Sequence, residues 1–139
     1  MRHLISLSLL LVLFSCSALK KKTKTAAGSV KGTSWELASI PGFALEKTKR
    51  PVTLNFGDTT NRAGGFTGCN TYGGNVEIKG TALKFGDILA TQKACMPGSK
   101  TERRVLDILR KTDHYKLSGG NLILLQGTGE LAVFRAAKK

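Results

Sequence analysis

The 139-residue sequence contains few of the residues that metal sites and acid–base catalysis require. It has two His and three Cys, and only nine Asp and Glu against 22 Lys and Arg, for a formal net charge of +13. It lacks the GxSxG, HExxH, P-loop and strand-linked GxGxxG motifs, so local spacing indicates no hydrolase, metalloprotease or nucleotide-binding site. We therefore predict no enzymatic activity, no metal and no cofactor, although local spacing does not report a site assembled from distant residues.

No apolar run is long enough to cross a membrane as a helix. The longest, Leu4–Phe14, has 11 residues with two serines among them, whereas a spanning helix needs about 20. With Arg2 before it, this run is typical of a secretory signal peptide, which we assign to residues 1–15. Residues 13–16 read LFSC and resemble a bacterial lipobox, which implies a diacylglycerol on the Cys16 thiol. The alternative is an ordinary signal peptide followed by an incidental cysteine.

Residues 16–32 are predicted to be a lipidated cysteine and a Lys-rich tether. The segment carries five Lys and no acid, without helical or strand periodicity. It would span roughly 22 Å as a flexible chain. The lysines either reinforce adsorption to anionic lipid or form a solvated spacer. Because Ser17 replaces the Asp that retains many lipoproteins at the inner membrane, we expect lipid anchoring in the bacterial cell envelope, at the outer membrane facing the periplasm.

The remaining residues, 33–139, are predicted to form one basic domain. They carry 16 Lys and Arg and nine Asp and Glu, a balance of about +7. The basic residues are accompanied by few aromatic residues, so we predict no nucleic-acid partner. The expected partners are the membrane, through the lipid on Cys16, and an unknown envelope protein or anionic component.

Short apolar segments closed by Gly, Asn or Asp predict antiparallel strands joined by hairpins. Residues 118–121 and 126–129 are predicted to be tight hairpin loops. The fold class that follows is mainly β, a small antiparallel, curled or barrel-like sheet with one α-helix packed over it. The predicted strands are 35–40, 52–56, 65–68, 75–78, 83–85, 115–117, 122–125 and 131–134.

One segment, residues 100–112, has helical periodicity. Ser99 and Glu102 have the spacing of a capping box, in which each side chain bonds the other residue's amide. Asp107 is spaced to pair with Arg103 and Lys111. The apolar face packs on the sheet and is formed by Val105, Leu106, Ile108 and Leu109.

Two cysteines remain if Cys16 carries lipid. The export signal would bring Cys69 and Cys95 into an oxidising compartment, which favours a disulfide. The chain-entropy estimate for a loop of this length is about 3.5 kcal/mol of stabilisation. Two free buried thiols remain an alternative, as does a metal pair with His114, whose spacing is poor for zinc.

Two segments resemble the META domain, also called the HslJ-like family. They are GCNTYGG at residues 68–74 and LKFGDILATQKAC at residues 83–95. The resemblance covers residues 33–139 and implies a small antiparallel β fold with one helix in a bacterial envelope protein. Members are associated with heat shock, antibiotic tolerance and virulence. No established reaction accompanies the family, so it supplies no catalytic residues.

The motif at residues 68–74 is interpreted as a structural turn, with Tyr72 as its aromatic position. Gly68, Gly73 and Gly74 would permit a tight reversal with positive φ. Asn70 would hydrogen-bond backbone groups within the turn. A ligand-binding loop is the alternative interpretation.

These observations predict a non-enzymatic envelope lipoprotein that binds an envelope component or protein and contributes to stress or antibiotic tolerance. The alternatives are a secreted enzyme inhibitor and a small-ligand carrier on a barrel-like scaffold. His114 has no evident acid or nucleophile partner in the sequence. The aspartates at 58, 87, 107 and 113 form no evident acid–base pair.

Overall fold

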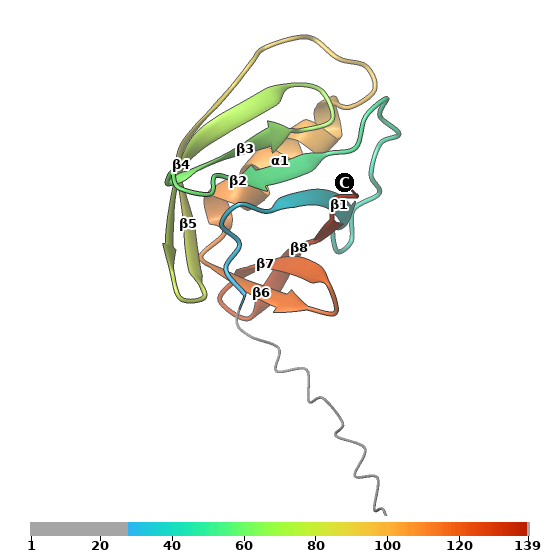
Figure 1. Cartoon of the computed structure of the whole chain (residues 1–139). Helices are drawn as coiled ribbons and strands as arrows, with labels where there is room; N and C mark the ends of the chain where they lie inside the picture. Colours follow the sequence, from blue (N-terminus) through green and yellow to red (C-terminus); the bar gives the residue numbers. More distant parts are fainter. Residues whose placement is uncertain (1–27, 139) are drawn as a thin grey trace, which may run out of the picture.

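The structure, a computed structural model, describes residues 28–138. Eight of its segments are strands, and neighbours along the chain pair antiparallel into a closed barrel with one helix (Figure 1). The predicted fold class is therefore confirmed. The elements are β1 (Ser34–Ser39), β2 (Thr53–Phe56), β3 (Arg62–Phe66), β4 (Thr71–Lys79), β5 (Ala82–Ala90), α1 (Ser99–Lys111), β6 (His114–Ser118), β7 (Asn121–Gln126) and β8 (Gly129–Ala136).

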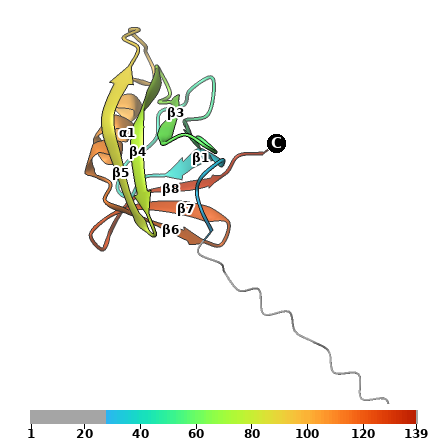
Figure 2. The ribbon, with the colours of Figure 1, turned by 60° about the vertical axis from the view of Figure 1, so that its left-hand side comes forward.

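The barrel has one weak seam, between β5 and β6. Its register contains one residue pair, Ala82 with His114. Two backbone bonds flank that pair: the Leu83 amide donates to the Asp113 carbonyl and the Tyr115 amide donates to the Thr81 carbonyl. Helix α1 connects β5 to β6 and packs against β5 (Figure 2). The helix therefore covers the part of the ring where strand pairing is sparse.

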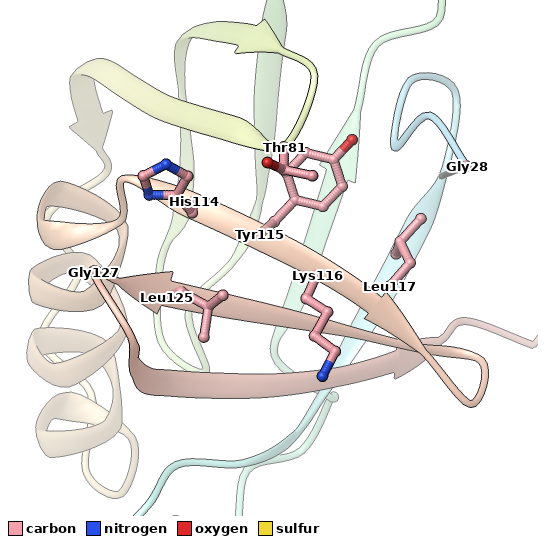
Figure 3. Close-up of a pocket in the computed structure, with 8 residues that line it drawn as sticks. All are labelled: Gly28, Thr81, His114, Tyr115, Lys116, Leu117, Leu125 and Gly127. Carbon is pink, nitrogen blue, oxygen red and sulfur yellow. The ribbon is translucent and has the colours of Figure 1, made fainter. Parts of the chain in front are cut away.

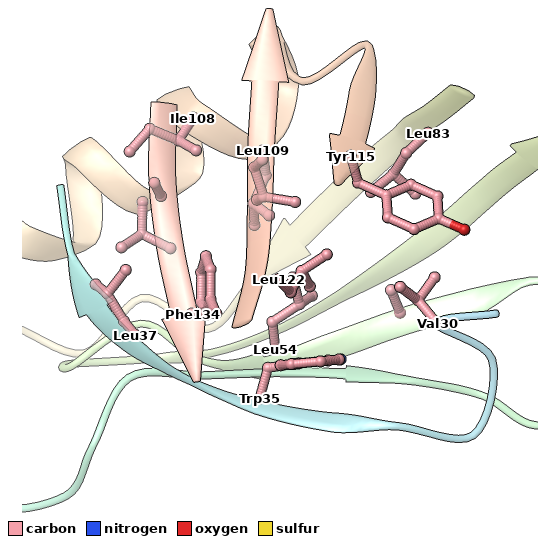
Figure 4. Close-up of a cluster of buried hydrophobic side chains, with 14 of the residues drawn as sticks. Val30, Trp35, Leu37, Leu54, Leu83, Ile108, Leu109, Tyr115, Leu122 and Phe134 are labelled. Atoms are coloured by element: carbon pink, nitrogen blue, oxygen red, sulfur yellow. The ribbon is translucent and has the colours of Figure 1, made fainter. Parts of the chain in front are cut away.

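Alternating residues of the strands fill the barrel interior. Leu54, Leu122 and Phe134 are almost completely buried, and Ile108 and Leu109 point towards them from the helix (Figure 4). Full burial of each such side chain contributes about 1.5–3 kcal/mol relative to exposure. The predicted apolar face of the helix is therefore part of the core.

The two predicted hairpin loops are confirmed. Gly119 and Gly120 join β6 to β7 with φ of 57° and 77°, the left-handed conformation that a two-residue type I′ loop requires. Gly127, with φ of 56°, begins the loop between β7 and β8. Both loops place glycine where an L side chain would be strained.

The predicted capping box is wrong. Gly98 occupies the N-cap position of α1, and no side chain caps the helix from that position. The Glu102 amide donates to the Gly98 carbonyl at 2.9 Å, and the Glu102 side chain turns to the β3–β4 loop instead. The helix itself spans 99–111, one residue earlier than predicted. Asp107 pairs with Lys111, as predicted, and with Arg104 instead of the predicted Arg103.

A residue before the predicted domain boundary at residue 33 packs against the domain. Val30, assigned to the tether, is completely buried in the core. Cys16 and the signal segment lie outside the described residues. No helix within residues 28–138 has the length and apolar character to cross a membrane.

Candidate functional site

The Gly-Cys-Asn motif forms the turn between β3 and β4, and Asn70 is the centre of a hydrogen-bond network there. The side chain of Asn70 is 2% exposed. Its oxygen accepts from the Lys93 amide at 2.8 Å and the Thr91 hydroxyl at 2.7 Å. Its nitrogen donates to the Lys93 carbonyl and to Glu102 Oε1, each at 3.1 Å. Asn70 therefore joins the turn to the chain that follows β5, beyond the local turn bonds predicted for it.

Glu102 closes this network from the helix. Its Oε2 accepts from the Thr67 hydroxyl at 2.5 Å and from the Asn70 amide at 3.0 Å. A carboxylate that accepts several hydrogen bonds replaces the hydration it loses when partly buried. The glutamate with capping-box spacing thus fixes the helix to the turn.

A disulfide joins Cys69 to Cys95, as the cysteine count favoured. The Cα atoms lie 5.7 Å apart, and the bond links the turn to the loop before α1. Asn70 Nδ2 lies 3.2 Å from Cys69 Sγ, so the covalent link and the hydrogen-bond network are contiguous. We call the end of the barrel formed by residues 44–52, 67–70 and 91–100 the disulfide pole.

Tyr72, Gly73 and Gly74 do not belong to the turn. β4 begins at Thr71, and positive φ occurs at Gly68 but not at Gly73 or Gly74. A Cβ on Gly74 would lie 2.5 Å from the Asp87 carbonyl oxygen, so this glycine permits close approach of β5. The buried Tyr72 hydroxyl donates to the Thr53 carbonyl at 3.0 Å, and burial raises its pKa.

Glu46 caps α1 from a distant loop, a role that the sequence pattern did not indicate. Its Oε2 accepts from the Thr101 amide at 2.8 Å, and the Glu46 amide donates to the Thr101 hydroxyl at 3.0 Å. Hydrogen bonding from the Thr101 amide, with smaller contributions from Gly98 and Lys100, lowers the pKa of Glu46. A separation of 55 residues leaves no local signal for this cap.

The residues after Glu46 form a basic wall at the disulfide pole. We call Lys47–Arg50 the basic loop. It lines a groove of about 390 Å³ whose other wall is Ala94–Pro97 and whose floor includes Gly68 and the disulfide. The Arg50 guanidinium lies 4.1 Å from the centre of the Phe66 ring, a cation–π contact.

The basic and acidic side chains at this pole differ in whether they have partners within the domain. Within residues 28–138, its exposed cations have no ion pair, whereas Glu46 and Glu102 accept hydrogen bonds from the helix and the turn. The pole therefore presents positive charge outward. These cations are Lys47, Lys49, Arg50, Lys93 and Lys100.

The opposite end of the barrel carries a second depression of about 640 Å³. Tyr115, Lys116 and Leu117 line it from β6, with Gly28 beside them, and the Lys116 side chain points to the other side of the strand from Tyr115 and Leu117 (Figure 3). His114, for which the sequence indicated no acid partner, lies 2.8 Å from Asp113. A hydrogen bond from the Gly127 amide, and to a smaller extent one with His114, lowers the pKa of Asp113. These contacts fix the β7–β8 loop.

The described residues contain no group of three or more His, Cys, Asp or Glu side chains placed to hold a metal. The domain is a closed barrel with one helix over its seam and a disulfide-linked turn. These features define a class of small single-helix β-barrel domains. Residues 28–139 match the META domain, and the chain belongs to that family.

Solved structures share this fold. The chain is similar to a protein from Burkholderia xenovorans determined by NMR, with 27% identity and a TM-score of 0.66 over 79% of this chain and 85% of that one. A second NMR structure has 18% identity and a TM-score of 0.61 over 76% of this chain and 89% of that one, which shows the fold alone. No curated protein matches the chain significantly.

Proposed function

We propose that this META-domain protein is a non-enzymatic lipoprotein of the bacterial envelope. A lipid on Cys16 anchors it, and the disulfide pole binds an anionic envelope component or protein, through which it contributes to stress or antibiotic tolerance. The observation that carries the binding proposal is the group of five exposed cations at that pole, for which residues 28–138 provide no ion pair. Such a surface attracts anionic partners, and salt weakens the attraction.

The hydrogen-bond network supports binding in preference to catalysis. Asn70 and Glu102 bond to each other and to the backbone of the turn, so these polar groups already have a structural role. A reacting group needs access to a substrate, whereas both oxygens of Glu102 are hydrogen-bonded within the domain.

The alternative functions have less support. A ligand carried inside the barrel is disfavoured because side chains such as Leu54, Leu122 and Phe134 fill the interior. An inhibitor of cationic enzymes such as lysozyme is disfavoured because the domain itself is basic, and like charges suppress encounter.

Complementation of an envelope-stress phenotype in a deletion strain tests the proposal. Each of five single Ala replacements should retain rescue where folding and abundance are unchanged. Loss of rescue by one such folded variant would contradict a binding function that does not depend on acid–base groups. The replaced residues are His114, Asp58, Asp87, Asp107 and Asp113.

A further inference from the structure

The groove beside the disulfide has the shape and charge to bind one extended chain. We propose that the groove binds an extended segment of another envelope protein, and that acidic and apolar side chains alternate along this segment. This inference rests on the proposed binding function and specifies its partner. The groove has a volume of about 390 Å³ between the basic loop and Ala94–Pro97.

The basic wall offers unused hydrogen-bond donors. Lys47 and Lys49 are exposed, and neither forms an ion pair within the described residues. Arg50 stacks on the Phe66 ring at 4.1 Å, a contact that orients the guanidinium and leaves its N–H edge available. A guanidinium held in this way can bind a carboxylate through two parallel hydrogen bonds.

The nearby acids do not neutralise this wall. The Glu46 carboxylate, next to Lys47 in sequence, accepts from the Thr101 amide at the start of α1. Glu102 accepts from Thr67 and Asn70. An incoming carboxylate therefore meets the cations without competition from either glutamate.

The basic wall is held in place before a partner arrives. The Glu46–Thr101 bonds fix the start of the basic loop to the helix, and the Thr48 hydroxyl donates to the Arg50 carbonyl at 2.7 Å. A Cβ on Gly68 would lie 3.1 Å from Thr48 Cγ2, so this glycine lets the loop pack closely on the motif turn. Such preorganisation reduces the entropy lost on binding.

The facing wall is apolar. Ala94, Met96 and Pro97 line it, and Met96 is 93% exposed. A methionine side chain adapts to irregular apolar partners. Because successive side chains of an extended chain point in opposite directions, alternation places acids on the basic loop and apolar groups on this wall.

The groove favours a protein segment over a membrane surface. It is concave, whereas a bilayer presents a broad surface that a recess does not match. The loop that contains Ala94–Pro97 also lies at the opposite end of the barrel from the segment where the described chain begins (Figures 1 and 2).

Peptide binding to the lipidated full-length protein in detergent micelles tests the groove. One synthetic peptide alternates Glu and Leu, and a second has the same composition with its glutamates and leucines in separate blocks. We expect the alternating peptide to bind at least tenfold more tightly, with a lower affinity at 300 mM salt than at 50 mM. Equal binding of both peptides would overturn the proposal, as would displacement of the alternating peptide by phosphatidylglycerol added to the micelles but not by phosphatidylcholine.

A charge-matched pair of variants locates the binding. Lys47→Glu/Lys49→Glu should weaken peptide affinity at least tenfold. Lys84→Glu/Lys116→Glu makes the same charge change at exposed residues outside the pole and should change the affinity less than twofold. Similar losses in both variants would show attraction to net charge alone and would overturn the groove as the site.

Photo-crosslinking in cells separates this inference from the broader function. A photoreactive residue at Met96 should crosslink a partner segment rich in Asp and Glu, and one at Lys116 should not. A partner captured from Lys116 alone, with rescue retained by Lys47→Glu/Lys49→Glu, would overturn the groove and the disulfide pole as the binding surface, but would leave a non-enzymatic binding function intact. Rescue lost through a single folded variant of His114 or an aspartate would instead contradict the function itself.

Discussion

Asn70 connects three parts of the chain, so its truncation should destabilise the domain strongly. Asn70→Ala removes the partners of the Lys93 amide and carbonyl and of one Glu102 oxygen. Each buried group left unpaired costs about 1–3 kcal/mol, and we expect a total loss of about 3 kcal/mol. Urea unfolding followed by circular dichroism measures the change.

Asn75→Ala is the matched control for that experiment. Asn75 is an exposed residue of β4, and its replacement should change the free energy of unfolding by less than about 0.5 kcal/mol. If Asn70→Ala were as stable as Asn75→Ala, the network would have no stabilising role.

Glu46 should give the domain part of its acid sensitivity. Its pKa in the folded protein lies below the ordinary value of 4.5, so its stabilising contribution is present above that pH. The contribution disappears as the pH falls through the folded pKa. Glu46→Gln should therefore melt at a lower temperature than the wild type at pH 7, and this difference should shrink below about pH 4.5.

Thermal melting between pH 7 and pH 3 measures this difference. Glu130→Gln, at an exposed acid of β8, should keep the wild-type dependence of melting temperature on pH. A constant difference between Glu46→Gln and the wild type over this range would contradict an ionised cap on α1.

Apart from the disulfide, which the cysteine count favoured, residue roles were predictable from the sequence where they depend on local spacing. Gly119-Gly120 fixes a hairpin by its own backbone preference, and that prediction was correct. Glu102 has capping-box spacing, but Thr67 and Asn70 attract its carboxylate across 35 and 32 residues. Tertiary hydrogen bonds therefore overrode a local signature.

Among the strand elements, β4 should be sensitive to the size of one glycine. Gly74→Ala would place its Cβ 2.5 Å from a backbone oxygen of β5, whereas the Cβ of Gly73→Ala would meet the nearest atom at 3.8 Å. We expect Gly74→Ala to destabilise the domain by about 1–3 kcal/mol. Gly73→Ala should be nearly neutral, and urea unfolding compares the two. Equal stabilities would show that β5 moves away without loss.

The disulfide should stabilise the connection between the motif turn and α1. Cys69→Ser/Cys95→Ser removes a link between residues 26 apart, and the loop-entropy estimate is about 3.5 kcal/mol. The double variant should melt at a lower temperature than the wild type. Added reductant should lower the melting temperature of the wild type but not the melting temperature of the variant. Labelling of both cysteines in the exported, denatured protein without reductant would contradict the bridge.

Element lengths were less predictable than element types. β3 contains Gly64, and β4 contains Gly73 and Gly74, which lie outside the predicted strands 65–68 and 75–78. Glycine is disfavoured in strands. Gly64, Gly65 and Gly74 let neighbouring backbones approach closely, a requirement set by the partner strands. The groove was equally hidden, because the basic loop and Ala94–Pro97 meet only in the folded chain.

For the whole molecule, the anchor should be visible at the mature N-terminus. Mass spectrometry should find the chain beginning at Cys16 with a diacylglycerol on the thiol. Cys16→Ala should be soluble or remain unprocessed, because no acceptor for lipid remains. Ser17→Ala is the matched control and should still be lipidated. An unmodified N-terminus beyond residue 16 would contradict the anchor.

The pairing of β1 with β8 makes completion of this barrel depend on the order in which the chain becomes available. β1 is bonded to β2 and to β8, the last strand of the sequence. A chain emerging amino-terminus first from a ribosome or an export channel exposes one edge of β1 until residues 129–136 appear. Contacts between such distant residues form slowly because long loops must close. Unpaired strand edges invite aggregation, so a holding chaperone should be most useful to this protein during that interval.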